Sequence, residues 1–99
     1  MVRVERLDWD TWNIEHIARH RVNPEDVEDV LWGAPVEYKQ SYKNRLVIVG
    51  PRSDGLMLTV VIGPVPDAPA GTFYVFTARP AHRVERRFYR DVKGEFSHE

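Results

Sequence analysis

The sequence predicts an α+β domain in which an antiparallel sheet of four to five strands carries two N-terminal helices and one C-terminal helix. Two observations lead to this prediction. Apolar residues recur at helical spacing near both ends of the chain, and between Val36 and Ala78 they alternate or form β-branched runs bounded by turn signals. The expected order of elements is β-α-α-β-β-β-β-α. A chain of 99 residues is enough for one such domain with a single core.

The first expected element is a short strand within "VRVERL". Val2 and Val4 alternate with charged residues, which is typical of a half-exposed strand at a sheet edge. A helix is expected to follow from about Trp12 to His20, with Asp10 or Thr11 as its N-cap. The buried side of this helix is expected to consist of Ile14, Ile17 and Ala18.

The second helix is expected within "NPEDVEDVLWG", which carries every boundary signal of a helix. Asn23 is the N-cap, Pro24 takes the first helical position, and Gly33 follows the last turn. Its buried stripe is expected to consist of Val27, Val30 and Leu31. We also expect Trp12, Trp32 and the aromatic residues of the strands to lie in the core.

The strands are expected in the middle of the chain. "VEYKQSY", "RLVIVG" and "LMLTVVIG" read as three antiparallel strands, the last two joined by a turn at "SDG". "PVPDAPAG" must be a loop, because proline cannot continue a strand ladder. "TFYVFTA" is the last strand, with one face expected to carry Phe73, Val75 and Thr77 and the other to carry Tyr74 and Phe76.

The C-terminal helix is expected from Pro80 to about Asp91, within a domain of residues 1–93 followed by a flexible tail at 94–99. One side of this helix should be apolar, consisting of Ala81, Val84, Phe88 and Val92. A second side should form an arginine stripe of Arg79, Arg83, Arg86 and Arg90, with His82 and Tyr89 beside it. Such a stripe is either a solvated face or a phosphate-binding surface, because guanidinium groups pair with phosphate oxygens.

The charge is unevenly distributed along the chain. Residues 1–37 contain four arginines and nine acids, a net charge of −5, and residues 38–93 contain ten Lys or Arg and four acids, a net charge of +6. This division fits a basic working face and an acidic face that meets a basic partner.

Several functional classes are excluded or disfavoured. There is no cysteine, so disulfides and thiolate chemistry are excluded. No apolar run suits a membrane span and no secretion signal is present, so we expect a cytoplasmic protein without a membrane partner. No phosphate-binding glycine loop and no serine-hydrolase elbow occurs. His16 and His20 have metal-ligand spacing but no third ligand, so we expect their imidazoles to pack against Trp12 or a neighbouring carbonyl, with no metal and no cofactor.

Three blocks of the sequence resemble the BrnT toxin family, in order and at similar spacing: "WDTWNIEHIARHRVNPEDVEDVL", "YKNRLVIVGPRSDGLMLTVVI" and "FYVFTARPAHRVERRFYR". The resemblance covers residues from about Leu7 to Arg90. The chain differs from the family at Asn13, where a lysine is common, and at Arg21, where a glycine is common. The matching positions are Trp9, Asp10, Arg19, His20, Val22, Arg45, Thr77, Ala78, Arg79, Ala81, Glu85, Arg86 and Tyr89.

The resemblance implies a RelE-like fold and the toxin component of a type II toxin–antitoxin system. Such a toxin cleaves RNA without a metal, is neutralised by a cognate antitoxin of the BrnA kind, and commonly occurs as a homodimer within that complex. A non-catalytic RNA- or protein-binding module of the same fold and a topoisomerase-inhibiting toxin are the alternatives.

Metal-independent RNA cleavage needs cations around the phosphate and groups that transfer protons. The residues expected to hold the phosphate are Arg45, Arg79, Arg83 and Arg86. His82 or Tyr89 is expected to transfer protons, and His20 is a more remote candidate. Glu85 is expected to orient an arginine through an ion pair, and Arg52 is a further secondary candidate.

Overall fold

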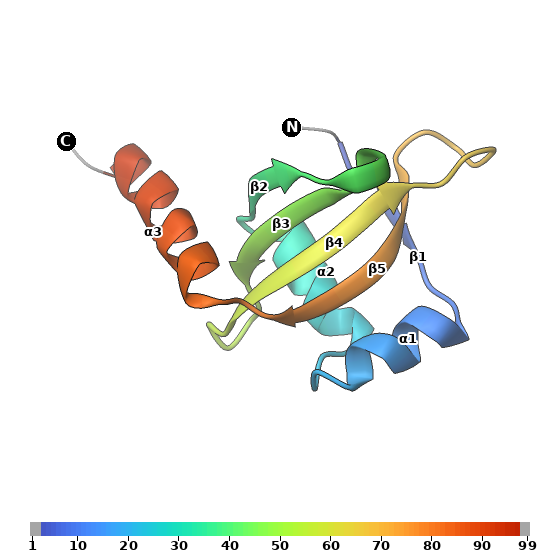
Figure 1. The fold of residues 1–99 in the computed structure, drawn as a ribbon, viewed down its shortest axis with the longest axis horizontal. Helices are drawn as coiled ribbons and strands as arrows, with labels where there is room; N and C mark the ends of the chain where they lie inside the picture. The colour runs from blue at the N-terminus through green and yellow to red at the C-terminus, as the bar shows by residue number, and fades with distance from the viewer. Residues whose placement is uncertain (1–2, 98–99) are drawn as a thin grey trace.

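The fold is described from a computed structural model, which covers the backbone of residues 3–97 and the side chains of residues 3–94. It is an α+β structure with three α-helices and a five-stranded mixed sheet (Figure 1). The elements are β1 (Arg6–Asp8), α1 (Thr11–Ala18), α2 (Pro24–Trp32), β2 (Val36–Gln40), the short 3₁₀ turn η1 (Tyr42–Asn44), β3 (Leu46–Pro51), β4 (Met57–Pro64), β5 (Thr72–Pro80) and α3 (Arg83–Ser97).

The strand order is β1-β5-β4-β3-β2. Strands β2 to β5 pair antiparallel as expected, but β1 pairs parallel with β5, so the prediction of a purely antiparallel sheet is wrong. Local patterning predicts a strand without predicting its partner. The partner here is 66 residues away along the chain, with Arg6 opposite Thr72.

Strand β1 is at the sheet edge as expected, but it begins later than the alternation of Val2 and Val4 suggests. Only Arg6 to Asp8 pair with β5, and the backbone N–H groups of Glu5 and Arg6 both donate to the carbonyl of Gly71, at 2.8 and 3.1 Å. Val4 packs against the core without belonging to the ladder, and Val2 lies outside the described residues.

Helix α1 is shorter than expected because its sequence closes it early. Asp10 and Asn13 form a reciprocal capping box at the start. At the end, the N–H of Val22 donates to the carbonyl of Ile17 and that of Arg21 to Ala18, with Arg21 at a φ of 61°. This is a Schellman closure, which favours glycine at the position that Arg21 occupies.

The buried side of α1 also differs from the prediction. Ile17 and Asn13 are fully buried, whereas Ile14 is 40% exposed and Ala18 is exposed. Trp12 and Trp32 are 57% and 51% exposed, so their expected place in the core is wrong. The helical spacing of apolar residues shows that a helix has an apolar side. It does not show which of two such sides packs against the sheet.

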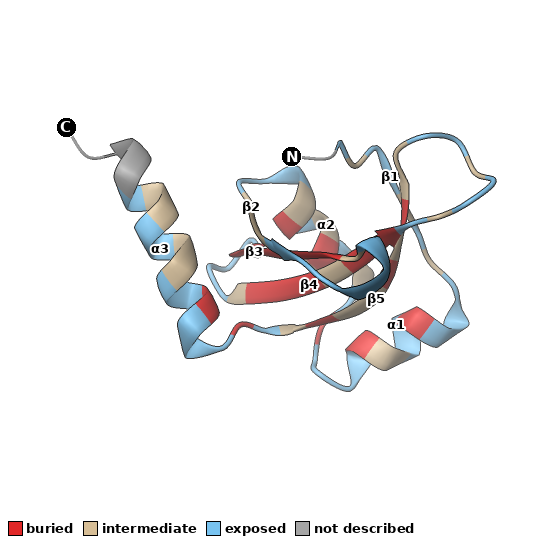
Figure 2. Ribbon diagram, turned by 45° about the horizontal axis from the view of Figure 1, so that its top comes forward, coloured by how far each residue is buried: buried red, intermediate tan, exposed pale blue. Residues whose placement is uncertain are grey.

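Helix α2 agrees with the sequence prediction in its Asn23 capping box, its proline and its buried Val27 and Val30. Helices α1 and α2 pack on one face of the sheet and form the core with it (Figures 1 and 2). The core consists of Ile17, Val22, Val27, Val30, Leu46, Ile48, Leu58, Val60, Ile62, Phe73, Val75 and Ala78.

Strand β5 contains a bulge that changes which residues share a face. Val61 pairs with Thr77 and the next residue, Ile62, pairs with Val75, which leaves Phe76 as the extra residue. Thr77 therefore lies on the face opposite Val75, and the predicted grouping of these two residues is wrong.

Helix α3 begins three residues later than expected and continues beyond Asp91 to Ser97. Pro80 is the last residue of β5, so Arg79 lies on a strand and not on the predicted helical stripe. The predicted tail starts inside α3, and residues 98–99 lie outside the described part. Val84, which was expected on the buried side of α3, is 66% exposed, and its neighbour Glu85 is buried instead. The buried side of the helix is therefore rotated by about one residue from the predicted side.

Candidate functional site

The buried carboxylate of Glu85 is the centre of a hydrogen-bonded cluster at the junction of β5 and α3. Its side chain accepts two hydrogen bonds from the Arg79 guanidinium, at 2.8 and 2.7 Å, and one from the Thr59 hydroxyl at 2.8 Å. The backbone N–H of His82 donates a further bond of 2.6 Å to Glu85, which caps the first turn of α3. Every one of these donors favours the charged form of the carboxylate.

The hydrogen bonds from Arg79 lower the pKa of Glu85 from 4.5 to about 2, and the bonds from His82 and Thr59 add to this effect. Burial acts in the opposite direction but does not prevail. The same ion pair raises the pKa of Arg79. The expected ion pair between Glu85 and an arginine is thus present, and it fixes the position of α3 relative to β4 and β5.

Thr59 is a member of this cluster that sequence reasoning missed. It is fully buried on β4 and points to the face opposite the α1–α2 layer, since its neighbours Leu58 and Val60 belong to the core. Thr59 also pairs directly with Arg79 across the β4–β5 ladder. A single hydroxyl within the apolar run "LMLTVVIG" was the available signal, because a buried hydroxyl needs a hydrogen-bond partner.

Three exposed basic side chains surround the start of α3. The His82 side chain is 71% exposed, with its Nδ1 atom 4.0 Å from a Glu85 oxygen. Arg83 and Arg86 are also exposed, and within the described residues neither has a carboxylate at ion-pair distance. One guanidinium nitrogen of Arg86 donates to the carbonyl of Ala81 at 2.7 Å, which directs this side chain back toward His82.

Tyr89 lies one turn further along α3 and has a structural contact. Its hydroxyl donates to the backbone carbonyl of Ala34 at 2.8 Å, and burial raises its pKa. Next to it, the ring of Phe88 packs edge-on against Tyr38 of β2, with 4.9 Å between centroids. Both contacts hold α3 against the α2–β2 connection, so the structure does not place the Tyr89 hydroxyl among the exposed groups near His82.

Arg45 lies on the same face of the sheet as the Glu85 cluster but toward the other end. Its guanidinium stacks on the ring of Phe76 at 3.7 Å, and a Cβ atom on Gly63 would approach that ring to 2.8 Å. Glycine at position 63 therefore permits this stacking. Phe76 precedes Arg79 by three residues on β5, a separation of about 10 Å along the strand.

The two remaining candidates, His20 and Arg52, lie away from this face. His16 stacks on Trp12 at 4.7 Å as expected, whereas His20, which follows α1, contacts His16 edge-on at 6.1 Å and not Trp12. Arg52 forms two hydrogen bonds of 2.8 Å with Asp54 and an ion pair of 3.5 Å with Asp26 of α2. The structure thus brings together Arg79, His82, Arg83, Glu85 and Arg86 but not His20 or Arg52.

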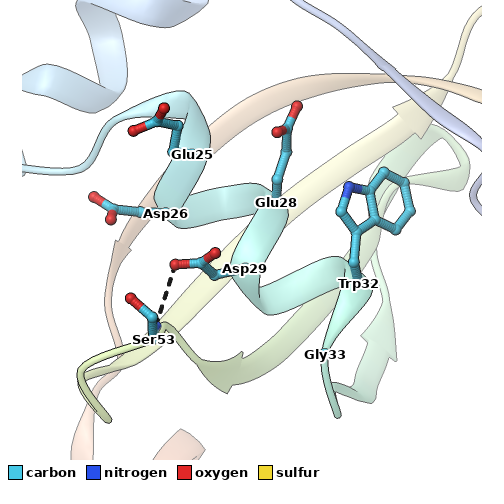
Figure 3. Close-up of a pocket in the computed structure, with 7 residues that line it drawn as sticks. All are labelled: Glu25, Asp26, Glu28, Asp29, Trp32, Gly33 and Ser53. Atoms are coloured by element: carbon cyan, nitrogen blue, oxygen red, sulfur yellow. Dashed lines mark hydrogen bonds between the residues drawn. The ribbon is translucent and has the colours of Figure 1, made fainter.

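A second charged surface lies on α2 (Figure 3). Glu25, Asp26, Glu28 and Asp29 line a shallow pocket together with Trp32, Gly33 and Ser53. Asp29 accepts a hydrogen bond of 3.2 Å from the backbone N–H of Ser53, and the Trp32 ring stands at the opposite end of the pocket. Four acids of the acidic first part of the chain therefore gather on one surface of α2.

No group of three or more His, Asp or Glu side chains suited to a metal ion occurs in the described part of the chain. Within the same residues, no helix has the length and apolarity needed to cross a membrane. No model of a known protein family matches this chain, and no curated protein is significantly similar to it. The resemblance to BrnT toxins stays a prediction from sequence motifs.

Proposed function

We propose that this protein is the toxin of a type II toxin–antitoxin pair, a metal-independent endoribonuclease of the BrnT-like, RelE-like kind that acts in the cytoplasm. The observation that carries the proposal is the Glu85–Arg79 ion pair, which fixes the first turn of α3, where the exposed basic residues His82, Arg83 and Arg86 lie close together in the sequence. RNA is the substrate, a BrnA-like antitoxin is the neutralising partner, and a homodimer is the form within that complex.

The chemistry follows from which groups are exposed. Among the described residues of this cluster, His82 is the one with an imidazole side chain, the type that serves most often as a general base. It takes the proton from a ribose 2′-hydroxyl, whose oxygen then forms a bond to phosphorus. The bond from phosphorus to the 5′-oxygen breaks, the departing oxygen takes a proton from water, and the hydroxide left behind takes the proton from His82. The products are a 2′,3′-cyclic phosphate and a 5′-hydroxyl.

Arg83 and Arg86 supply positive charge for the pentavalent phosphate. Arg79 is a positioning residue, because Glu85 already occupies two of its donors. In this proposal Arg45, whose guanidinium stacks on Phe76, binds a neighbouring phosphate of the same RNA strand.

A non-catalytic binding module of the same fold is the second candidate, and Asn13 favours it. Asn13 is fully buried, its amide donates to the carbonyl of Asp8 at 2.9 Å, and its oxygen accepts from the N–H of Asp10 at 2.8 Å. A residue fixed in this way joins β1 to α1 and has no group left for catalysis, whereas a lysine is common here in the resembling family.

The deciding experiment incubates the purified protein with a structured RNA in excess EDTA and identifies the product ends. Cleavage that leaves 2′,3′-cyclic phosphates supports the ribonuclease. Intact RNA that is nevertheless retained by the protein in a gel-shift assay supports the binding module. Intact and unbound RNA, together with inhibition of DNA gyrase supercoiling, supports a topoisomerase-inhibiting toxin.

A further inference from the structure

A groove runs along α3 on the side next to the start of β4. Its lining residues are Met57, Arg86, Tyr89, Arg90, Lys93 and Gly94. Five of them lie on α3 between positions 86 and 94, so the groove follows about two turns of this helix. These residues belong to the part of α3 that extends away from the sheet, and in its described residues the ribbon there is exposed or intermediate (Figures 1 and 2).

The floor of the groove is apolar. Met57 contributes its thioether chain and Tyr89 contributes its ring, because the Tyr89 hydroxyl is bonded to the carbonyl of Ala34. Met57 is also fixed from its backbone, since its carbonyl accepts the N–H of Ala81 at 2.8 Å. A preformed apolar floor of this kind suits a branched or aromatic side chain.

The rim of the groove is cationic. Arg86 and Arg90 are four residues apart on α3, and the ammonium group of Lys93 lies 5.6 Å from the centroid of the Tyr89 ring. No acidic side chain lines the groove within the described residues. An occupant therefore needs apolar groups for the floor and negative charge for the rim.

We propose that this groove binds an amphipathic helix of a partner protein, with apolar side chains on Met57 and Tyr89 and carboxylates on Arg86 and Arg90. Two turns of a helix carry apolar anchors at i, i+3, i+4 and i+7, which matches the length of the groove. Carboxylates pair with guanidinium groups through two hydrogen bonds. A nucleobase fits less well, because its edges need acceptors as well as donors and the rim offers donors.

The position of the groove has a regulatory consequence that rests on the proposed function. Arg86 belongs both to the groove and to the basic cluster beside His82, so a helix in the groove competes with RNA for this side chain. Helix binding itself does not depend on RNA cleavage and can be measured without RNA.

The test uses a fluorescein-labelled synthetic helical peptide with leucine at i, i+3, i+4 and i+7 and glutamate elsewhere, and it measures fluorescence anisotropy without RNA. Arg90→Glu is compared with Arg87→Glu, a matched charge reversal at an exposed residue of α3 outside the groove. We expect Arg90→Glu to weaken binding about tenfold and Arg87→Glu less than about twofold. A second peptide with serine in place of leucine should bind about tenfold more weakly.

Equal weakening by the two substitutions, or equal binding of the leucine and serine peptides, would overturn the proposal, since charge alone would then explain the binding. Failure of the acidic peptide to bind would also overturn it. The same comparison is made with labelled oligouridine. If Arg90→Glu weakened binding of oligouridine but not of the peptide, relative to Arg87→Glu, the groove would be an RNA-binding site and the proposal would be wrong. Each outcome can be read whether or not the protein cleaves RNA.

Discussion

The start of α3 and the surface beside α2 carry opposite charges, and each contains one residue of the other sign. The start of α3 is basic and contains one carboxylate, whereas the surface beside α2 is acidic and contains one guanidinium. At α3, the single carboxylate of Glu85 lies among arginines, and its side chain is 10% exposed. Beside α2, the single guanidinium of Arg52 lies among carboxylates and pairs with Asp54, whose side chain is 58% exposed. The two carboxylates have the same lowered pKa, about 2, because each accepts hydrogen bonds from an arginine. Because the two pKa values are alike, we expect the difference in burial to decide which of the two ion pairs contributes more to the free energy of unfolding.

The largest expected effect is that of Glu85→Gln. It removes the negative charge from a buried pair and leaves the Arg79 guanidinium without a counter-ion, so the free energy of unfolding should fall by about 3 kcal/mol. Asp54→Asn removes an equivalent partner from Arg52 at the surface and should leave the urea midpoint at pH 7 unchanged. Equal losses from the two substitutions would show that burial does not distinguish the pairs.

The contribution of Glu85 should also depend on pH. Its folded pKa, about 2, is below the ordinary value of 4.5, so the stabilisation is complete above about pH 5 and is lost as the pH falls toward 2. The difference in unfolding free energy between wild type and Glu85→Gln, measured in urea from pH 7 to pH 3, should therefore shrink with acidification. A difference that stays constant over this range would contradict the assigned ion pair.

A smaller effect is expected from Thr59→Val, which keeps the shape of the side chain but removes its hydrogen bond to Glu85. The loss should be about 1 kcal/mol in urea unfolding. Thr77→Val is the matched control, because Thr77 lies on the same face of the sheet and its hydroxyl has no hydrogen bond to a described residue. If the control costs as much as Thr59→Val, the bond to Glu85 is not the cause.

The smallest expected effect concerns RNA affinity. Arg83→Gln removes an exposed charge beside His82 and should weaken binding of a labelled single-stranded RNA about fivefold at roughly 0.15 M salt. Glu28→Gln neutralises an acid of the α2 surface and should change the affinity by less than about twofold at the same salt concentration, because charges farther apart than the Debye length of about 8 Å are then largely screened. A larger effect at Glu28 would place RNA on the wrong surface for the proposed function.

Sequence patterns predicted those features best that depend only on residues close together in the chain. The cap, the proline and the buried Val27 and Val30 of α2 are as expected, and the predicted Leu31 is partly buried, because each depends on residues within one helix. The parallel pairing of β1 with β5, the bulge at Phe76 and the exposure of Trp12 depend on distant partners, and the sequence patterns did not predict them.

The candidate site shows the same division. The basic character of residues 79–90 and the role of Glu85 as a partner for arginine followed from the sequence. The separation of Arg79 from the helical arginines did not, because a helical wheel cannot show that β5 continues to Pro80. Thr59 was missed for a related reason, since its link to Glu85 spans 26 residues.

The most direct test of the central claim compares two exposed histidines on opposite layers of the molecule. RNA cleavage rates in excess EDTA would be measured for wild type, His82→Ala and His20→Ala, each with an unfolding curve to verify folding. We predict that His82→Ala slows cleavage about 100-fold or more and that His20→Ala cleaves at the wild-type rate. Cleavage by His82→Ala at the wild-type rate, or no cleavage by the wild type, would contradict the assignment of the active site to the start of α3.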